Sequence, residues 1–450
     1  MRPMNPVIIE RVIYPAYRAL KRDRVLRYLA EAREVGRMGP DRIRDYQLQK
    51  LTRLLAHAWA HVPYYRGVFK DLGAEPGDFR HLSDLAGLPI LRKRTFRENA
   101  QDLMSDAYPA SRLTPGSTSG STGESLYFHY DAASSESRRA SHIHMNQWLG
   151  IRVGEKTAYL WGTAFDAARS KRLASSLRSY LSNTLVLSAY TMDAETIEAY
   201  SATLARFRPK VFVSYPSFLV HFSKSPAAKG TAGFSPPVIL VSGETLFEWQ
   251  RATIEQGFGA KVYNHYGCCE FGAMARECRA RNGLHLASER LLVETVPIGK
   301  SPGGDDLAEL VITDLDNLGM PFIRYGIEDA GSITWERCEC GLTLPRLESA
   351  LGRTFDVVRA PNGNAIGGTF WTILLKRAKG IERLQVVQEK LDAITIRLEA
   401  TQEFSDDDRA YVLGKIREAC GPAMQVTLDL GGKIEMRPGG KHRLVISHIK

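Results

Sequence analysis

Short apolar segments alternate with helical stretches through the middle of the chain, and this alternation constrains the fold more than any other feature. Val211–Val213, Val238–Val241 and Leu291–Val293 each have the length of a buried strand. Residues 194–207, which come just before the first of these segments, carry apolar side chains at helical spacing. Buried strands that alternate with helices are typical of a sheet covered on both faces. The sequence therefore predicts an α/β fold.

The pattern changes near Arg353. Strand-like segments at 384–388, 393–398 and 425–430, with a helix from about 406 to 419, indicate a small α+β unit. A chain of 450 residues also exceeds the size at which one hydrophobic core stops growing. We therefore expect an N-terminal domain of residues 1–352, which begins with a helical segment over 1–90, and a C-terminal domain of residues 353–450.

Composition excludes several classes of protein. With 44% apolar and 24% charged residues the chain is an ordinary globular protein. The net charge of +10 favours anionic ligands, but the cations are dispersed and no aromatic-basic RNA-binding pattern occurs, so no nucleic acid is expected as a partner. No apolar run is long enough to span a bilayer. Without a secretion signal, six cysteines indicate a reducing compartment, and we expect a cytoplasmic protein.

The first helix is basic and amphipathic, with Val12, Tyr17 and Leu20 at helical spacing among Arg and Lys. Two interpretations are open. In the favoured one the helix packs on the body of the protein, and in the other it makes a peripheral contact with a membrane.

Two segments have the residue types that bind nucleotides. The loop Thr118–Glu124 joins glycines, which let the backbone approach an anion, to hydroxyls that donate to phosphate oxygens. It lacks the Gly-Lys-Ser/Thr of a Walker A loop. In Tyr266–Glu270 an aromatic ring suited to stacking on a base stands four residues before a carboxylate suited to Mg²⁺. Either segment alone would be a weak signal.

Three further positions extend the pattern towards the C-terminus. Asp329 follows a strand and could accept both hydroxyls of a ribose. Arg353 offers a guanidinium for phosphate or ribose oxygens. Lys441 follows two glycines in the small domain, whose movement would deliver it to a phosphate.

In this order the motifs resemble those of the adenylate-forming (ANL) superfamily, which includes acyl-CoA synthetases, firefly luciferase and peptide-synthetase adenylation domains. The resemblance spans nearly the whole chain. It is closest to the phenylacetate-CoA ligase branch and its capsular-polysaccharide-associated (CapK-like) relatives, on the segments Leu54–Ala58, Val62–Arg66, Tyr215–Ser217, Ser242–Glu244 and Cys278–His285. It implies a large α/β domain followed by a small mobile α+β domain.

The resemblance also assigns roles by motif. It implies that the ATP phosphates are held by Thr118, Ser119, Gly120, Ser121, Thr122 and Gly123. It implies that adenine is bound by Ser242, Gly243, Glu244, Gly267 and a stacked Tyr266. Glu270 would bind Mg²⁺, and Asp329 and Arg353 would hold the ribose. Lys441 matches the catalytic lysine that stabilises charge while a carboxylate attacks the α-phosphorus of ATP.

The expected activity is AMP-forming activation of a carboxylic acid followed by acyl transfer. CoA is the favoured acceptor. An amine or a hydroxyl acceptor would make the protein an amide or ester ligase, and a non-catalytic nucleotide-binding scaffold is a further alternative. Cys269 stands where the superfamily usually has Thr, and Phe355 stands where it often has a carboxylate; these departures support the scaffold.

A separate set of residues indicates zinc. Cys338 and Cys340 form a tight thiol pair, and Cys278 and His285 lie upstream. Three thiolates and one imidazole form a closed tetrahedral set of the structural type. The alternative interpretation is four reduced, buried side chains without a metal.

Overall fold

The computed structural model describes residues 5–118, 126–161, 183–188, 194–225, 235–300, 306–353, 358–362, 365–366, 371, 381–401, 404–431, 434 and 445–449. The chain divides into two compact units. The first comprises Met1–Glu294, Val311–Ile327 and Ile333–Glu348, and the second comprises Thr295–Leu310, Glu328–Ser332 and Ser349–Lys450. Four strands contribute residues to both units: β10 (Leu291–Lys300), β11 (Asp306–Asp314), β12 (Tyr325–Thr334) and β13 (Arg346–Arg353). The predicted boundary at residue 353 stays a prediction.

Five parallel strands form the centre of the first unit. In spatial order they are β7 (Lys261–Cys268), β6 (Val238–Val241), β5 (Val211–Ser214), β3 (Thr157–Trp161) and β4 (Thr184–Ser188). All four residues of β6 are buried, as expected of a strand covered on both faces. The predicted strands at 211–213 and 238–241 are thus confirmed.

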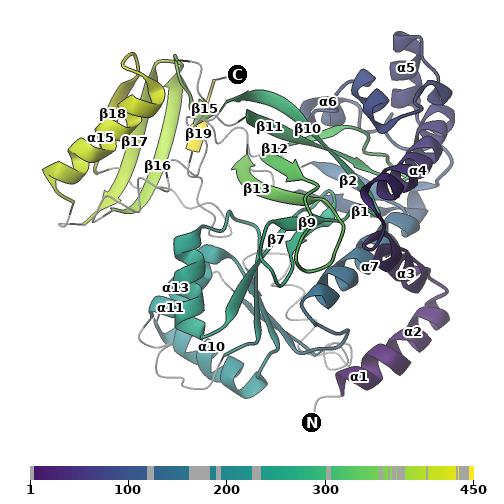
Figure 1. Ribbon diagram of the computed structural model, residues 1–450, viewed down its shortest axis with the longest axis horizontal. Coiled ribbons are helices and arrows are strands. Elements are labelled where there is room, and N and C mark those ends of the chain that lie inside the picture. Colours follow the sequence, from purple (N-terminus) through teal and green to yellow (C-terminus); the bar gives the residue numbers. More distant parts are fainter. Residues whose placement is uncertain are drawn as a thin grey trace. The chain divides into compact units, whose positions relative to one another are not determined.

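Apolar side chains cover both faces of these strands. On one face lie α10 (Ala194–Phe207), α11 (Pro216–Lys224) and α13 (Glu248–Phe258) (Figure 1). Their apolar side chains join Phe212 and Ile239 in one buried cluster. On the other face, Leu149 and Ile151, which follow α7 (Ala132–Trp148), pack against alternate residues of β5 and β6. Alternation along each strand therefore supplies both cores.

The sheet continues antiparallel beyond β7. Strand β8 (Gly272–Glu277) pairs with β7, β9 (Leu284–Leu286) pairs with β8, and β13 pairs with β9. A separate hairpin joins β1 (Thr114–Ser117) to β2 (Tyr127–Tyr130). The strand expected after the Ser/Thr/Gly loop is confirmed as β2.

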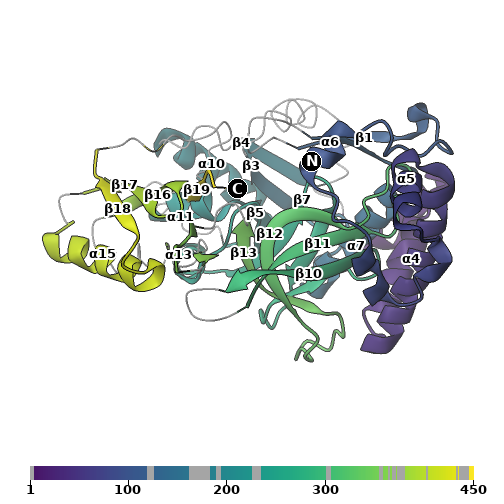
Figure 2. The same ribbon diagram turned by 90° about the horizontal axis from the view of Figure 1, so that it is seen from above.

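The N-terminal region is helical, as predicted. Its α-helices are α1 (Pro6–Ile8), α2 (Tyr14–Lys21), α3 (Val25–Val35), α4 (Pro40–His61), α5 (Pro63–Leu72) and α6 (Lys93–Glu98), with a π-helical turn over Ile9–Ile13 between the first two. Short 3₁₀ turns occupy Pro76–Asp78, Leu82–Gly87 and Ala110–Arg112. Helices α4 and α5 lie side by side (Figures 1 and 2). Each of them begins with a proline at its first position.

The second unit contains a four-stranded sheet in the order β18 (Gln425–Asp429), β17 (Ala393–Ala400), β16 (Ile381–Lys390) and β19 (Val445–Ser447). Helix α15 (Asp406–Cys420) packs on it through Val412 and Ile416. Ser405 caps this helix by accepting from the Asp408 amide, and Asp408 accepts from the Ser405 amide in return. A two-stranded ladder pairs β14 (Val358–Arg359) with β15 (Ala365–Ile366). The predicted α+β pattern is confirmed.

No described helix combines the length and the apolar character that crossing a bilayer requires.

The second unit has its own core, which a cavity should weaken. We expect Ile416→Ala to lower the free energy of unfolding by about 2–5 kcal/mol, because Ile416 is fully buried against the sheet. Chemical denaturation measures this change. Leu391→Ala is the matched control, since Leu391 is exposed in the β16–β17 turn, and it should change the value by less than about 0.5 kcal/mol. Equal effects of the two substitutions would contradict the assignment of this core.

Candidate active site

The carboxyl ends of the parallel strands gather the predicted nucleotide-binding segments at one edge of the sheet. Tyr215–Ser217 follows β5, and Ser242–Glu244 follows β6. Tyr266 and Gly267 are near the carboxyl end of β7. Strands that run in parallel place their carboxyl ends at the same edge, where ligands of open α/β sheets bind. The structure thus brings together three segments that are separated in sequence.

Two aromatic rings stand at this edge. Trp161 ends β3 and stacks on Tyr215, with ring centroids 4.2 Å apart and planes inclined by 23°. Tyr215 is buried, while Trp161 stays partly exposed. The two rings thus form one stacked aromatic pair at this edge.

The segment after β6 is held in a defined conformation. Ser242 is nearly buried, and its amide donates to the Ser214 carbonyl over 3.2 Å. Gly243 has φ of +81°, a value that residues with a side chain rarely adopt. The Glu244 carboxylate accepts hydrogen bonds from the amide and the hydroxyl of Ser217, at 3.0 and 2.8 Å, at the N-terminus of α11. Glu244 therefore fixes the β6 loop to that helix.

Gly267 must be glycine. A Cβ atom at this position would overlap the carbonyl oxygen of Gly272 on the neighbouring strand β8. Tyr266, the residue before it, is partly buried, and Ala275 lies opposite Tyr266 in the ladder. The absence of a side chain at Gly267 lets β7 and β8 pack closely at the end of their ladder, just before Glu270.

Glu270 lies two residues after the end of β7, with its side chain buried. The Tyr325 hydroxyl donates to one of its carboxylate oxygens over 3.2 Å. Arg138 of α7 donates to the main-chain carbonyl of Glu270. The carboxylate and the backbone of this predicted Mg²⁺ ligand are therefore held by different elements.

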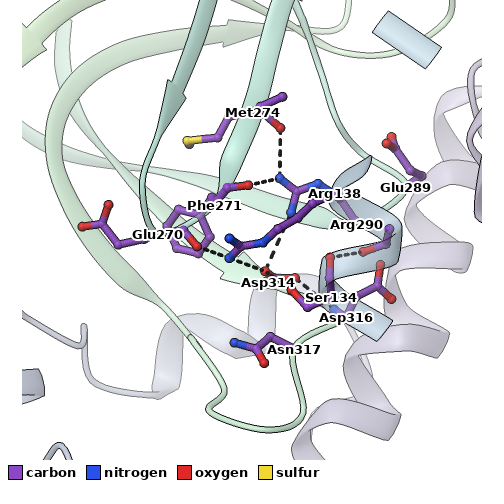
Figure 3. A network of polar contacts seen from close by, with 12 residues as sticks. Ser134, Arg138, Glu270, Phe271, Met274, Glu289, Arg290, Asp314, Asp316 and Asn317 are labelled. Carbon is purple, nitrogen blue, oxygen red and sulfur yellow. Dashed lines mark hydrogen bonds and ion pairs between the residues drawn. The ribbon is translucent and has the colours of Figure 1, made fainter. Parts of the chain in front are cut away.

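Behind Glu270 lies a buried polar network (Figure 3). Arg290 donates to the carbonyls of Phe271 and Ala273, the latter over 2.9 Å. Asp314 pairs with Arg138 at 3.6 Å and with Arg290 at 3.7 Å, and neither Asp314 nor Arg290 is exposed. Asp314 is thus a shared ion-pair partner of the two guanidinium groups that hold the Glu270–Phe271 backbone.

A second buried cation lies between β7, β8 and α7. The Arg276 guanidinium is fully buried and donates to His265 Nδ1 over 3.2 Å and to the side chain of Asn146. Burial lowers the pKa of Arg276 to about 10. His142 faces His265 with ring centroids 6.0 Å apart, and burial, followed by the charge of Arg276, lowers the pKa of His142 to about 3. Burial, followed by the charge of Arg276, also lowers the pKa of His265, so both rings are neutral near pH 7.

Sequence reasoning missed Arg138, Arg290, Asp314, Arg276 and His142. Each is a single charged or polar residue without a motif around it; four are in a helix or a strand, and Arg290 is in the turn before β10. The only sequence signal is the presence of Arg at positions that the strand pattern of β8 and the helix pattern of α7 place inside.

The predicted zinc residues form one cluster. The ligand atoms of Cys278, His285, Cys338 and Cys340 all lie within 4.8 Å of one another. Cys278 Sγ is 3.7 Å from Cys338 Sγ, and Cys340 Sγ is 3.2 Å from His285 Nε2. His285 Nδ1 donates to the Leu344 carbonyl over 3.1 Å, which leaves Nε2 facing the thiols.

The remaining predicted residues are distributed as follows. The Thr118 hydroxyl accepts from the Leu126 amide over 3.0 Å, closing the base of the Ser/Thr/Gly loop. Asp329 is in β12 and the backbone of Arg353 ends β13, both within the second unit. Outside the described residues lie Ser119, Gly120, Ser121, Thr122, Gly123 and Lys441.

Comparison with known proteins gives three concordant findings. Residues 358–448 match the family model of the CapK C-terminal domain. A phenylacetate-coenzyme A ligase of Thermus thermophilus is 24% identical over 90% of this chain and 96% of its own length. Protein CapK of Staphylococcus aureus is 22% identical over 82% of this chain and 81% of its own. The chain is similar to phenylacetate-coenzyme A ligases and to CapK over most of its length.

Solved structures agree on the fold. A 2-hydroxyisobutyryl-CoA ligase in the postadenylation state, in complex with an acyl-AMP, matches with a TM-score of 0.71 and 20% identity over 92% of this chain and 91% of its own. An open conformation of the same ligase, with acyl-AMP and CoA, matches with a TM-score of 0.63 at 20% identity, covering 92% of this chain and 93% of its own. The chain has the fold of the adenylate-forming ligases, so the resemblance predicted from its motifs is confirmed.

Removing the shared carboxylate should destabilise the backbone around Glu270. We expect Asp314→Asn to lower the free energy of unfolding by about 3 kcal/mol or more, because Arg138 and Arg290 would lose their counter-charge in a buried setting. Urea denaturation measures the change. Asp41→Asn is the control: Asp41 pairs with Arg44 at only 2.7 Å but is 94% exposed, and should cost less than about 1 kcal/mol. Similar losses for both variants would contradict the role of burial.

Proposed function

We propose that this chain activates a carboxylic acid with ATP, forming an acyl-adenylate and pyrophosphate, and then transfers the acyl group to CoA. The observation that carries the proposal is the convergence of the β5, β6 and β7 segments at one edge of the sheet, in the fold of adenylate-forming ligases. The relatives named phenylacetate-coenzyme A ligase support the same chemistry.

Adenylation solves a leaving-group problem. A carboxylate would have to expel oxide, whereas an acyl-adenylate expels AMP. In the first step a carboxylate oxygen of the acid attacks the α-phosphorus, and the bond to the bridging oxygen breaks to release pyrophosphate. In the second step the CoA sulfur attacks the acyl carbon, the thiol proton is lost, and AMP leaves. The protein contributes positioning and stabilisation of phosphoryl charge.

The roles of individual residues follow the motifs. The loop Thr118–Gly123 would hold the phosphates, and Ser242–Glu244 with Tyr266 would bind adenine. Glu270 would hold Mg²⁺, which would neutralise phosphate charge; its carboxylate fits because only one of its oxygens accepts from Tyr325. Asp329 and Arg353 would hold the ribose, and Lys441 would stabilise the charge that develops at the α-phosphorus.

The acceptor decides the class of ligase. With CoA the product is a thioester, and with an amine or a hydroxyl it is an amide or an ester. The test is release of pyrophosphate and AMP by the full chain, screened over aromatic, aliphatic and hydroxy acids, with and without CoA. We expect acid-dependent pyrophosphate release, and AMP release that CoA stimulates. Turnover that depends on an amine and not on CoA would identify the amide ligase, and no activity with any acid would favour the nucleotide-binding scaffold.

Lys441 gives this activity a sharp control. We expect Lys441→Ala to depress pyrophosphate release by at least about a hundredfold, because one charge that stabilises the transition state is removed. The affinity for ATP, measured by equilibrium binding, should change far less. Lys415→Ala replaces a lysine in the same unit that pairs with Glu418 at the surface, and it should leave both values unchanged. An unaltered rate in Lys441→Ala would remove the role given to that lysine.

We also propose that Cys278, His285, Cys338 and Cys340 bind a structural Zn²⁺. The donor set fits: the ligand atoms already lie within 4.8 Å, and the Leu344 carbonyl fixes the imidazole tautomer. Burial lowers the pKa of His285 to about 4, so the ring is neutral, as a ligand must be. Partial desolvation also raises the pKa of the Cys340 thiol to about 12, and a bound cation would stabilise its thiolate.

Metal analysis tests the zinc proposal. We expect about one equivalent of zinc per chain in protein purified without chelators, and a lower melting temperature after removal of the metal. Cys338→Ser should lose the zinc. Cys420→Ser is the matched control, since Cys420 is buried in the core of the second unit, and it should retain the full equivalent. If neither the parent chain nor the Cys420→Ser variant held zinc, the interpretation as four reduced side chains without a metal would be favoured.

A further inference from the structure

Exposed apolar side chains are concentrated at the N-terminus. Among the described residues nine large apolar side chains are exposed, and five of them lie between residues 8 and 26: Ile8, Val12, Tyr17, Leu20 and Leu26. Val12 is 61% exposed, Leu20 is 82% exposed and Ile8 is 50% exposed. Scattered single apolar residues at a surface are ordinary, whereas a local concentration indicates a contact surface.

The first three helical segments align these residues. Ile8, Val12, Ala16 and Leu20 recur every four residues through α1, the π-helical turn and α2, and all four are exposed. In a regular α-helix such a row would drift around the axis, but a π-helical turn has more residues per turn and reduces the drift. We call this row the outer stripe.

The opposite face of the helix is anchored to the body of the first unit. Ile9 is buried against Gly154. A Cβ atom added to Gly154 would lie only 2.6 Å from Ile9 Cγ2, so the two residues are in close contact. Arg18 is buried, pairs with Asp23 at 2.7 Å and lies over the Tyr14 ring at 4.6 Å. The helix therefore packs on the protein as predicted, but only through one face, and this anchoring directs the outer stripe away from the body.

The charges around the outer stripe have one sign. The exposed charged residues between positions 5 and 27 are all cations: Arg11, Lys21, Arg22, Arg24 and Arg27. The two acids of this segment are only partly exposed and are already engaged, Glu10 with Arg152 at 4.0 Å and Asp23 with Arg18. Arg11 flanks the stripe three residues after Ile8, and Lys21 and Arg22 follow Leu20 directly.

We propose that this face docks on an anionic lipid surface. An apolar row flanked by cations inserts its side chains at the boundary of headgroups and acyl chains, while the cations bind lipid phosphates. A second copy of the chain fits less well, because a two-fold axis would bring identical cation clusters together. The proposal is independent of the ligase activity, since none of these residues belongs to the candidate active site.

The test is co-sedimentation of the full chain with vesicles of phosphatidylcholine, alone or with phosphatidylglycerol. We expect binding to the anionic vesicles at low salt that weakens at high salt. Val12→Ser/Leu20→Ser should lower the partition coefficient by about tenfold or more. Arg11→Gln/Lys21→Gln/Arg22→Gln should lower it on the order of a hundredfold, at about fivefold per cation.

Matched controls carry the same chemistry elsewhere on the surface. Leu72→Ser/Leu430→Ser removes two other exposed leucines, and Arg42→Gln/Arg53→Gln/Lys70→Gln removes three other exposed cations. Both should bind as the parent chain does. Failure of the parent to bind anionic vesicles, or equal losses in stripe and control variants, would overturn the proposal. So would a dimer in sedimentation equilibrium that only the Val12/Leu20 variant dissociates, because the stripe would then bind a second copy.

Discussion

Parallel pairing of β3, β5, β6 and β7 is the constraint on which the candidate site depends. Strands that run in the same direction end at one edge, and each must return through a helix or a long connection. The loops that leave this edge therefore meet, although they are separated by tens of residues in sequence. Trp161, Tyr215, Ser242 and Tyr266 are neighbours of one edge for this reason. The chemistry is carried by short segments, but their convergence is a property of the sheet.

Close approach of the backbone is the second requirement of the site. At Gly267 a side chain would overlap the next strand, and at Gly243 it would strain the turn. Glu244 then fixes the turn to α11, and the two arginines behind Glu270 fix the turn after β7. Buried charge is costly unless it is paired and hydrogen-bonded, so this support concentrates where Asp314 can pair with both guanidinium groups.

Much of this arrangement could be predicted from the sequence. The apolar runs of β5 and β6, the capped helix α15 and the motif residues after each strand carry local signals that period and residue type reveal. The Cys/His cluster could also be predicted, because thiols and imidazoles have few other reasons to recur together. The supporting residues could not: Arg138, Arg276 and His142 are single polar residues whose partners lie on other elements. The outer stripe shows the same limit, since periodicity gives a helix its faces but cannot say which face the fold will cover.

The Cys/His cluster also has a consequence for the order in which the chain folds. Cys278 and Cys338 are 60 positions apart, and His285 reaches its thiol neighbours only where β13 lies beside β9. A contact at this separation must close a long loop. The chain loses that loop entropy before the contact stabilises the fold. We therefore expect that these four side chains do not nucleate folding. We expect them to meet only after the antiparallel end of the sheet has formed, so that the cluster stabilises the fold late in folding.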